Sequence, residues 1–235
     1  MKVNGINVGC GVTPCERPGW ENLDNSPNAR LSRWPALRRL LFVVGLLPAS
    51  LFEVKWPKNI RIHDVRKGLP YADNSLSYVY CSRFLGQLYA DEARTFLGEC
   101  FRVLVPGGIL RVAVHDLKLL CRVYVESEDS GRAAAGSSRS GLPADHLLRA
   151  LNMAPDVAPR GFFKMVLRPF MGREILRRWN YDGQSLAARV REAGFTDVRR
   201  CSFRESCIPD IEALDLAGRE DVYVEGAKPR QNRAV

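Results

Sequence analysis

The chain has 235 residues, of which 46% are hydrophobic and 26% charged, so it can bury a core, and we expect one domain over residues 1–235 rather than two small ones. Its seven cysteines are odd in number and scattered, which argues against a disulfide framework or a zinc site and favours reduced thiols in a cytoplasmic protein. The net charge of +9 is compatible with anionic membranes, phosphorylated substrates or nucleic acid and selects none of them.

A glycine turn follows the first predicted strand. Gly5 and Asn7 interrupt the apolar start of the chain, so no secretion signal is expected. The strand 6–8 runs into the turn 9–11, and a second strand-like stretch, 20–23, precedes Asp24. In a nucleotide-binding α/β sheet, such a turn lets cofactor and backbone approach closely, and an acid after the next strand binds ribose hydroxyls. The pairing predicts a nucleoside cofactor.

An apolar segment with several arginines comes next, within residues 31–57. Pro48 ends its apolar run far short of the ~20 residues that a membrane span needs. The segment is either a cap over the active site or a helix lying on a membrane surface. We expect a cap, because burial within the chain is the commoner fate of an amphipathic helix.

Three more strands and one clear helix are predicted in the middle of the chain. The strands are 59–64, which ends in Asp64, then 76–81, and the largely apolar 109–114. The helix 91–104 takes Asp91 as its N-cap and is stopped by the Pro-Gly-Gly run 106–108. Helical or inserted segments between strands imply a parallel sheet, whose ligands bind at the carboxyl ends of its strands.

The last third of the chain contains a second insertion and a regular end. Residues 126–159 are rich in Ser, Gly, Ala and Pro and predict a mobile insertion, and 160–179 form a second cationic amphipathic element. We expect residues 122–178 to contribute to the cap. A helix capped by Asp182 and followed by Gly194, then the strands 195–203 and 221–227, complete the pattern.

With its predicted strands and helices in this order, the chain resembles the class I S-adenosylmethionine-dependent methyltransferases. The resemblance is greatest to the bacterial branch described as methyltransferase-domain-11-like. The stretches that carry the resemblance are INVGCG…GWENLD, HDVRKGLPYADNSLSYVYCS, DEARTFLGECFRVLVPGGILRVAVHDL and RRWNYDGQSLAARVREAGFTDV. The resemblance implies a Rossmann-like, doubly wound, mostly parallel seven-stranded α/β sheet with an antiparallel last strand, plus helical cap insertions. It also implies S-adenosylmethionine as the cofactor.

Seven positions carry over from the family as cofactor-binding residues: Gly9, Cys10 and Gly11 along the methionine part, Asp24 at the ribose, Asp64 and Val65 at the adenine, and Ser82 at the sulfonium. The chain departs from the family where Thr13 replaces the third glycine of the turn. Pro14, Pro18 and Gly19 leave no room for a full helix between the first two strands. Contacts to the cofactor's carboxylate are therefore expected from loop N–H groups.

The catalytic candidates are His115 and Asp116, at the end of the fifth strand. Imidazole titrates near neutrality, so His115 is the best base by position, although it could instead pack under a helix. Arg83 and Arg177 stand where relatives often carry a His, so a base from either segment is missing.

Four residues are expected at the acceptor: Arg83, Arg178, Trp179 and Tyr181. The two aromatic residues could form a wall of the acceptor pocket or could only anchor the helix that starts at Asp182. The arginines of 160–178 could be a solvated face, or they could bind a phosphate or carboxylate of the substrate.

These features predict in-line methyl transfer to an oxygen, less readily a nitrogen, of a sugar, glycan precursor or secondary metabolite, with anionic or lipid-linked acceptors left open. The alternative is a membrane-surface or lipid-carrier binding protein that uses the fold as a scaffold without catalysis. Nucleic acid is not expected as a substrate, because Ser82-Arg83-Phe84 stands where nucleic-acid methyltransferases carry N/D-P-P-Y/F. We expect a cytoplasmic protein, with contact to the inner membrane face left open.

Overall fold

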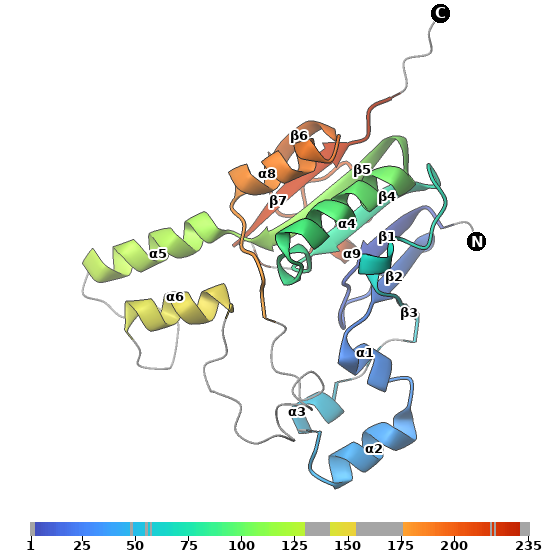
Figure 1. Cartoon of the computed structure of the whole chain (residues 1–235), viewed down its shortest axis with the longest axis vertical. Helices are drawn as coiled ribbons and strands as arrows, with labels where there is room; N and C mark the ends of the chain where they lie inside the picture. The colour runs from blue at the N-terminus through green and yellow to red at the C-terminus, as the bar shows by residue number, and fades with distance from the viewer. Residues whose placement is uncertain are drawn as a thin grey trace, which may run out of the picture.

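The computed structural model describes residues 3–47, 49–54, 56, 58–129, 142–153, 176–216, 218 and 220–230. Within these residues, seven strands form one sheet in the order β3-β2-β1-β4-β5-β7-β6 (Figure 1). Their bounds are β1 Gly5–Val8, β2 Trp20–Asp24, β3 Ile60–Ile62, β4 Leu76–Ser82, β5 Leu104–His115, β6 Thr196–Cys201 and β7 Asp221–Ala227. β1 to β5 pair in parallel, whereas β7 is antiparallel to both β5 and β6. The predicted mostly parallel, Rossmann-like sheet is confirmed.

The helices lie beside the sheet and at two extensions of it (Figure 1). Their bounds are α1 Pro27–Leu31, α2 Pro35–Val43, α3 Ala49–Phe52, α4 Ala90–Val103, α5 Leu117–Asp129, α6 Pro143–Leu151, α8 Gly183–Glu192 and α9 Ile211–Leu214, with the 3-10 turns η1 Val65–Lys67 and η2 Leu85–Gln87. α4 and α8 cover one face of the sheet, α5 and α6 pack together away from it, and α1 to α3 lie beyond the β3 edge.

The main core lies between the sheet and the helices α4 and α8. β5 contributes Leu110, Val112 and Val114, which are buried together with Phe96 of α4 and Leu186 of α8. The opposite face is covered mainly by loops and α9, with a smaller core of Cys15, Tyr80, Ile208 and Leu214.

A loop replaces the usual helix between β1 and β2, as the prolines predicted. The buried side-chain amide of Asn22 on β2 holds the loop, because its Oδ1 accepts from Cys15 N at 2.7 Å and its Nδ2 donates to Cys15 O at 2.9 Å. Asn7 on β1 donates to the same Oδ1 at 3.3 Å. The side-chain amide of Asn22, supported by that of Asn7, thus satisfies loop backbone groups that a helix would satisfy internally.

The structure corrects the predicted bounds around α4. The N-cap of α4 is Tyr89, not Asp91, and the carboxylate of Glu92 accepts the Tyr89 N–H at 3.0 Å. The run 106–108 does not stop the helix, because α4 passes directly into β5, which contains these residues.

The second insertion is partly helical. α6 lies within 126–159, for which composition predicted a mobile insertion, and it ends at Asn152 in the left-handed conformation. Most of the predicted cationic element 160–179 lies outside the described residues. At the end of the fold, α8 begins as predicted, with Asp182 Oδ1 accepting the Ser185 N–H at 2.7 Å, and Gly194 has φ +98°.

Candidate functional site

A cleft of about 280 Å³ opens at the carboxyl ends of β1 and β4. It is lined by Asn7, Gly9, Cys10, Gly11, Val12, Thr13, Tyr80, Ser82, Arg83, Gln87, Leu214 and Leu216. The structure therefore brings the glycine turn, Ser82 and Arg83 together, as predicted. This is the edge at which parallel α/β sheets bind their ligands.

The two glycines of the turn are held differently. Gly9 has φ +69°, and a Cβ there would lie 2.5 Å from Cβ of Phe84. Gly11 has φ +55°, but a Cβ there would meet nothing within 4 Å. Gly9 thus permits a close packing contact, whereas Gly11 borders open space. Burial, and secondarily the negative charge of Asp24, raises the pKa of the adjoining Cys10 to about 12, which keeps this thiol neutral.

Asp24 ends β2 and ties the turn to the next helix, but it is not among the residues that line the cleft. Its Oδ2 accepts the Gly11 N–H at 2.9 Å, and its Oδ1 accepts the Ser26 N–H at 2.7 Å. A carboxylate oxygen can accept two hydrogen bonds, so the side chain keeps acceptor capacity for further donors.

Asp64 and Val65, predicted at the adenine, are not among the residues that line the cleft. Asp64 accepts from Nε and Nη2 of Arg66 at 2.9 and 2.8 Å, and these hydrogen bonds hold the pKa of its carboxyl below the ordinary range. The side chain of Val65 is buried in the main core.

A buried carboxylate, Asp221 at the start of β7, joins two of the predicted residues. Its Oδ2 accepts from Arg83 Nε at 2.8 Å, and its Oδ1 lies 3.1 Å from His115 Nδ1. Burial tends to raise the pKa of Asp221, but the hydrogen bonds from His115 and Arg83 outweigh it and lower the pKa.

Sequence reasoning missed Asp221. The predicted antiparallel last strand held a usable signal, because His115 and Asp221 are directly opposite in the β5–β7 register. Side chains at such positions lie within contact of each other.

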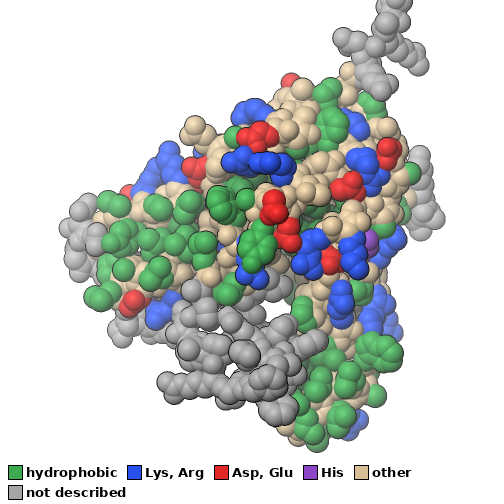
Figure 2. Space-filling view, in the orientation of Figure 1, with side chains coloured by type: hydrophobic (Ala, Val, Ile, Leu, Met, Phe, Trp, Pro, Cys, Tyr) green, Lys and Arg blue, Asp and Glu red, His purple; other side chains and the backbone are tan. Residues whose placement is uncertain are grey.

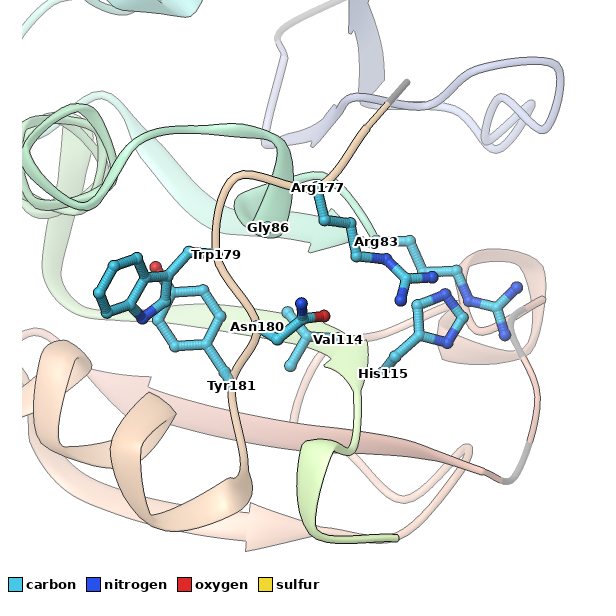
Figure 3. A pocket seen from close by; sticks show the side chains of 8 residues that line it. All are labelled: Arg83, Gly86, Val114, His115, Arg177, Trp179, Asn180 and Tyr181. Carbon is cyan, nitrogen blue, oxygen red and sulfur yellow. The ribbon is translucent and has the colours of Figure 1, made fainter. Parts of the chain in front are cut away.

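A second, small hollow of about 10 Å³ adjoins this cluster, roughly the volume that one water needs. Its lining residues are Arg83, Gly86, Val114, His115, Arg177, Trp179, Asn180 and Tyr181. Figure 3 shows the side chains of Arg83, Arg177 and His115 gathered on one side and those of Trp179 and Tyr181 on the other. Because Arg83 lines both spaces, the hollow and the cleft adjoin each other.

The segment that carries Trp179 is anchored on η2. Gly86 O accepts the N–H groups of Arg178 and Trp179 at 2.7 and 3.1 Å, and a Cβ on Gly86 would lie 2.8 Å from Trp179 O. Tyr181 is buried, and burial raises the pKa of its hydroxyl. Trp179 is half-exposed at the rim of the hollow.

Two further predicted residues, Asp116 and Arg178, also lie outside both spaces. Asp116 does not line either space; its Oδ1 accepts the Lys118 N–H at 3.0 Å, and its Oδ2 is 3.6 Å from Arg200 Nη2. The guanidinium of Arg178 stacks 4.9 Å from the ring centroid of Tyr89, outside the hollow. Arg177, which stands in place of a histidine and belongs to the arginines expected either on a solvated face or at the substrate, lines the hollow.

A buried ionic network supports the far wall of the cleft. Arg111 on β5 is fully buried and binds Asp215 Oδ2 at 2.5 Å and Glu225 Oε1 at 2.9 Å. Its Nη2 also donates to Ser202 O at 3.0 Å, which ties the segment 202–216 to the sheet. Leu214 and Leu216 of this segment line the cleft, so Arg111 positions that wall from within the core.

The two expected cap insertions contribute unequally to the described site. The described residues of 31–57 supply no lining residue to either space, whereas Arg177, from 122–178, lines the hollow. Among the described helices, none is both long enough and apolar enough to cross a bilayer.

Residues 48–112 match the family model of the methyltransferase domain, Methyltransf_11. None of the curated proteins compared with the chain matches it. Many solved structures do match. PigF with SAH is 16% identical, with TM-score 0.44, over 96% of this chain and 50% of that chain, so this chain spans half the length of PigF.

Two structures of more similar length also match. A SAM-dependent methyltransferase from Archaeoglobus fulgidus is 14% identical, with TM-score 0.49, over 97% of this chain and 87% of that chain. A SAM-dependent methyltransferase from Thermotoga maritima, described as a possible histamine N-methyltransferase, is 16% identical, with TM-score 0.46. The match covers 97% of this chain and 83% of that chain.

Proposed function

We propose that the chain is a class I S-adenosylmethionine-dependent methyltransferase and that it methylates a hydroxyl oxygen of an anionic small molecule, with His115 accepting the proton. A sugar, a glycan precursor or a secondary metabolite that carries a phosphate or carboxylate fits this description. The observation that carries the proposal is the buried Asp221 carboxylate, which holds both His115 and Arg83 beside the cleft.

The residues of the cleft fit the cofactor. The backbone at Gly11 borders open space where any side chain would intrude, and Ser82 and Gln87 supply polar groups along the same cleft. Asp24 retains acceptor capacity at the end of β2, where a ribose would be held. When bound, S-adenosylmethionine would supply an electrophilic methyl group.

The chain's own residues then have three tasks: to align the acceptor, to exclude water and to take one proton. Asp221 engages Nδ1 of His115 and so leaves Nε2 as the nitrogen that accepts the proton from the acceptor hydroxyl. The same carboxylate would stabilise the imidazolium that forms. Asp221 is therefore a positioning residue, and His115 is the proposed base.

Two arginines favour an acceptor with negative charge. Arg83 and Arg177 both line the hollow, on the same side as His115 (Figure 3). Guanidinium groups bind phosphate and carboxylate through their N–H donors. Nε and Nη2 of Arg83 already donate to Asp221, and Nη1 of Arg177 donates to Ala150 O, so their remaining donors would hold an anion beside the hollow, next to the proposed base. The half-exposed indole of Trp179 supplies an apolar surface on the other side of the hollow.

Isothermal titration calorimetry with S-adenosylmethionine tests the cofactor, and absence of binding at millimolar cofactor would overturn the proposal. Transfer of labelled methyl groups to a panel of neutral and phosphorylated sugars tests the acceptor, with phosphorylated members preferred. His115→Gln is expected to lower kcat by about 10²- to 10⁴-fold while cofactor affinity stays unchanged. Unchanged kcat would remove His115 from the mechanism.

A further inference from the structure

α2 turns a wholly apolar face away from the rest of the protein. The outer face of α2 is formed by Trp34, Leu37, Leu40, Val43 and Val44, all exposed. Figure 2 shows hydrophobic side chains gathered at this end of the molecule. Val43 is 72% exposed and Trp34 68%. Contiguous exposed apolar patches of this kind mark interaction surfaces.

The helices α1 to α3 form a helical unit beyond the β3 edge. The outer face of α2 is not needed to hold this unit together, because the inner side of α2 makes its own contacts with α3 and the residues that follow it. Phe42 stacks on Phe52 of α3 with ring centroids 4.2 Å apart. Arg38 Nη2 donates to Phe52 O at 2.8 Å and to Val54 O at 2.6 Å. Leu47, after the helix, is buried. The unit is thus built with its outer face left free for a partner.

The charge around this face identifies the partner's chemistry. Residues 25–54 contain four arginines, Arg30, Arg33, Arg38 and Arg39, against one acid, Glu53. A second copy of the chain would bring these like charges together, which disfavours a dimer through this face. An anionic lipid surface attracts them, while tryptophan favours the boundary between headgroups and acyl chains.

We propose that the outer face of α2 docks on an anionic membrane surface, with Trp34 and the aliphatic side chains entering the headgroup boundary and Arg39 binding lipid headgroups. α1 directly follows the carboxyl end of β2, so α2 lies on the chain's path from the edge at which the cofactor cleft opens. Docking would bring this edge close to lipid, which suits an acceptor carried by a lipid. The docking itself does not depend on methyl transfer.

Vesicle flotation of the full chain tests the proposal. Vesicles of phosphatidylcholine with phosphatidylglycerol should carry the protein, and vesicles of phosphatidylcholine alone should bind it at least about tenfold more weakly. Val43→Glu/Val44→Glu should weaken binding to the anionic vesicles by at least about tenfold, because two apolar side chains no longer enter the lipid. Trp34→Phe should remove the blue shift of tryptophan fluorescence on vesicle addition.

The matched control places the same substitutions on α5. Val123 and Val125 are also exposed, and Val123→Glu/Val125→Glu should leave vesicle binding unchanged. Arg39→Gln, which introduces no buried charge, should weaken binding several-fold at low salt, and circular dichroism checks that each variant is folded.

The proposal is overturned if the α2 pair binds vesicles like the parent chain, if the α5 pair alone loses binding, or if the parent chain binds no anionic vesicles. A dimer that Val43→Glu/Val44→Glu converts to monomer, without vesicle binding, would assign the face to a second copy. Calorimetry with S-adenosylmethionine on the same samples separates the two proposals, because the α2 variants should keep parental cofactor affinity whatever the vesicle result.

Discussion

Gly9 and Gly11 both adopt positive φ, but only Gly9 also sits against another side chain. Left-handed backbone costs an ordinary L-residue about 1–2 kcal/mol. At Gly9, the added Cβ would also overlap Cβ of Phe84, an atom next to the backbone that cannot swing away. A side chain at Gly11 would therefore introduce backbone strain alone, whereas a side chain at Gly9 would introduce both backbone strain and steric overlap.

Gly11→Ala is expected to lower the free energy of unfolding by about 1–2 kcal/mol, and Gly9→Ala by about 3 kcal/mol or more, because strain and overlap add. Urea denaturation of the two variants measures the difference. Equal losses would mean that Phe84 moves aside without cost.

Asp221 predicts a pH dependence with a definite sign. Its pKa is lowered on folding from the ordinary value of 3.8, so the folded protein binds this proton more weakly than the unfolded chain does. The ionised carboxylate therefore contributes stability that is present above the unfolded pKa and is lost as the pH falls through the folded pKa.

Asp221→Asn should destabilise the protein by about 1–3 kcal/mol at neutral pH, because a charge-assisted hydrogen bond is lost on each side. The difference between parent and variant should shrink as the pH is lowered below about 4. Denaturation at a series of pH values checks this, and a difference that stays constant down to the most acidic folded condition would contradict it.

Part of the site could be predicted from single residues, and part could not. The glycine turn, Ser82, Arg83 and His115 line the cleft or the hollow, and their place could be predicted because each lies at or just after the end of a strand in a recognisable order. Asp116 and Arg178 line neither space, because neighbours along an extended chain point to opposite sides, which order alone does not resolve.

At the scale of elements, the segment 202–216 depends on one arginine. Arg111 lies in an apolar strand yet is fully buried between Asp215 and Glu225, and its guanidinium also lies 4.7 Å from the ring centroid of Tyr223. Arg199 reaches the same Glu225 at 3.2 Å from the surface, with its side chain 55% exposed. The carboxylate of Glu225 thus pairs with two arginines, of which Arg111 is fully buried and Arg199 is exposed to solvent.

Arg111→Met should lower the free energy of unfolding by about 3–5 kcal/mol, because it leaves buried carboxylates without their partner. Arg199→Met should lower the free energy of unfolding by at most about 1 kcal/mol, because solvent screens its ion pair. Urea denaturation compares the two. Hydrogen exchange across 202–216 should rise in the Arg111 variant, and a protected segment would show that α9 is held by its apolar contacts alone.

The strands were predictable because apolar periodicity and flanking turns are local signals, and β7 matches its predicted bounds of 221–227. Arg111 within the apolar run of β5 was itself a sign of a buried ion pair, but Asp215 and Glu225 lie far along the chain. The start of α4 was missed because a capping carboxylate at Glu92, not the side chain at the N-cap, closes the first turn. α6 was missed because composition says little about short helices.

At the scale of the whole molecule, cofactor binding and folding are linked. A ligand that binds only the folded state stabilises it by about 2.7 kcal/mol at 100 times its Kd. S-adenosylmethionine at that excess should raise the parent chain's urea midpoint accordingly. The cofactor should raise the urea midpoint of the Gly9→Ala variant by less, because the substitution displaces the turn that borders the cleft. An equal gain in the variant would mean that the turn does not contact the cofactor.

The position of β7 between β5 and β6 has a consequence for how the protein is made. Within the described sheet β6 pairs only with β7, so β6 and α8 leave the ribosome before the strand that joins them to the sheet exists. Asp221 is the first residue of that strand, and His115 gains its partner only when β7 is inserted. A nascent or truncated chain that lacks β7 therefore presents an unoriented imidazole, so acquiring the proposed base coincides with completing the fold.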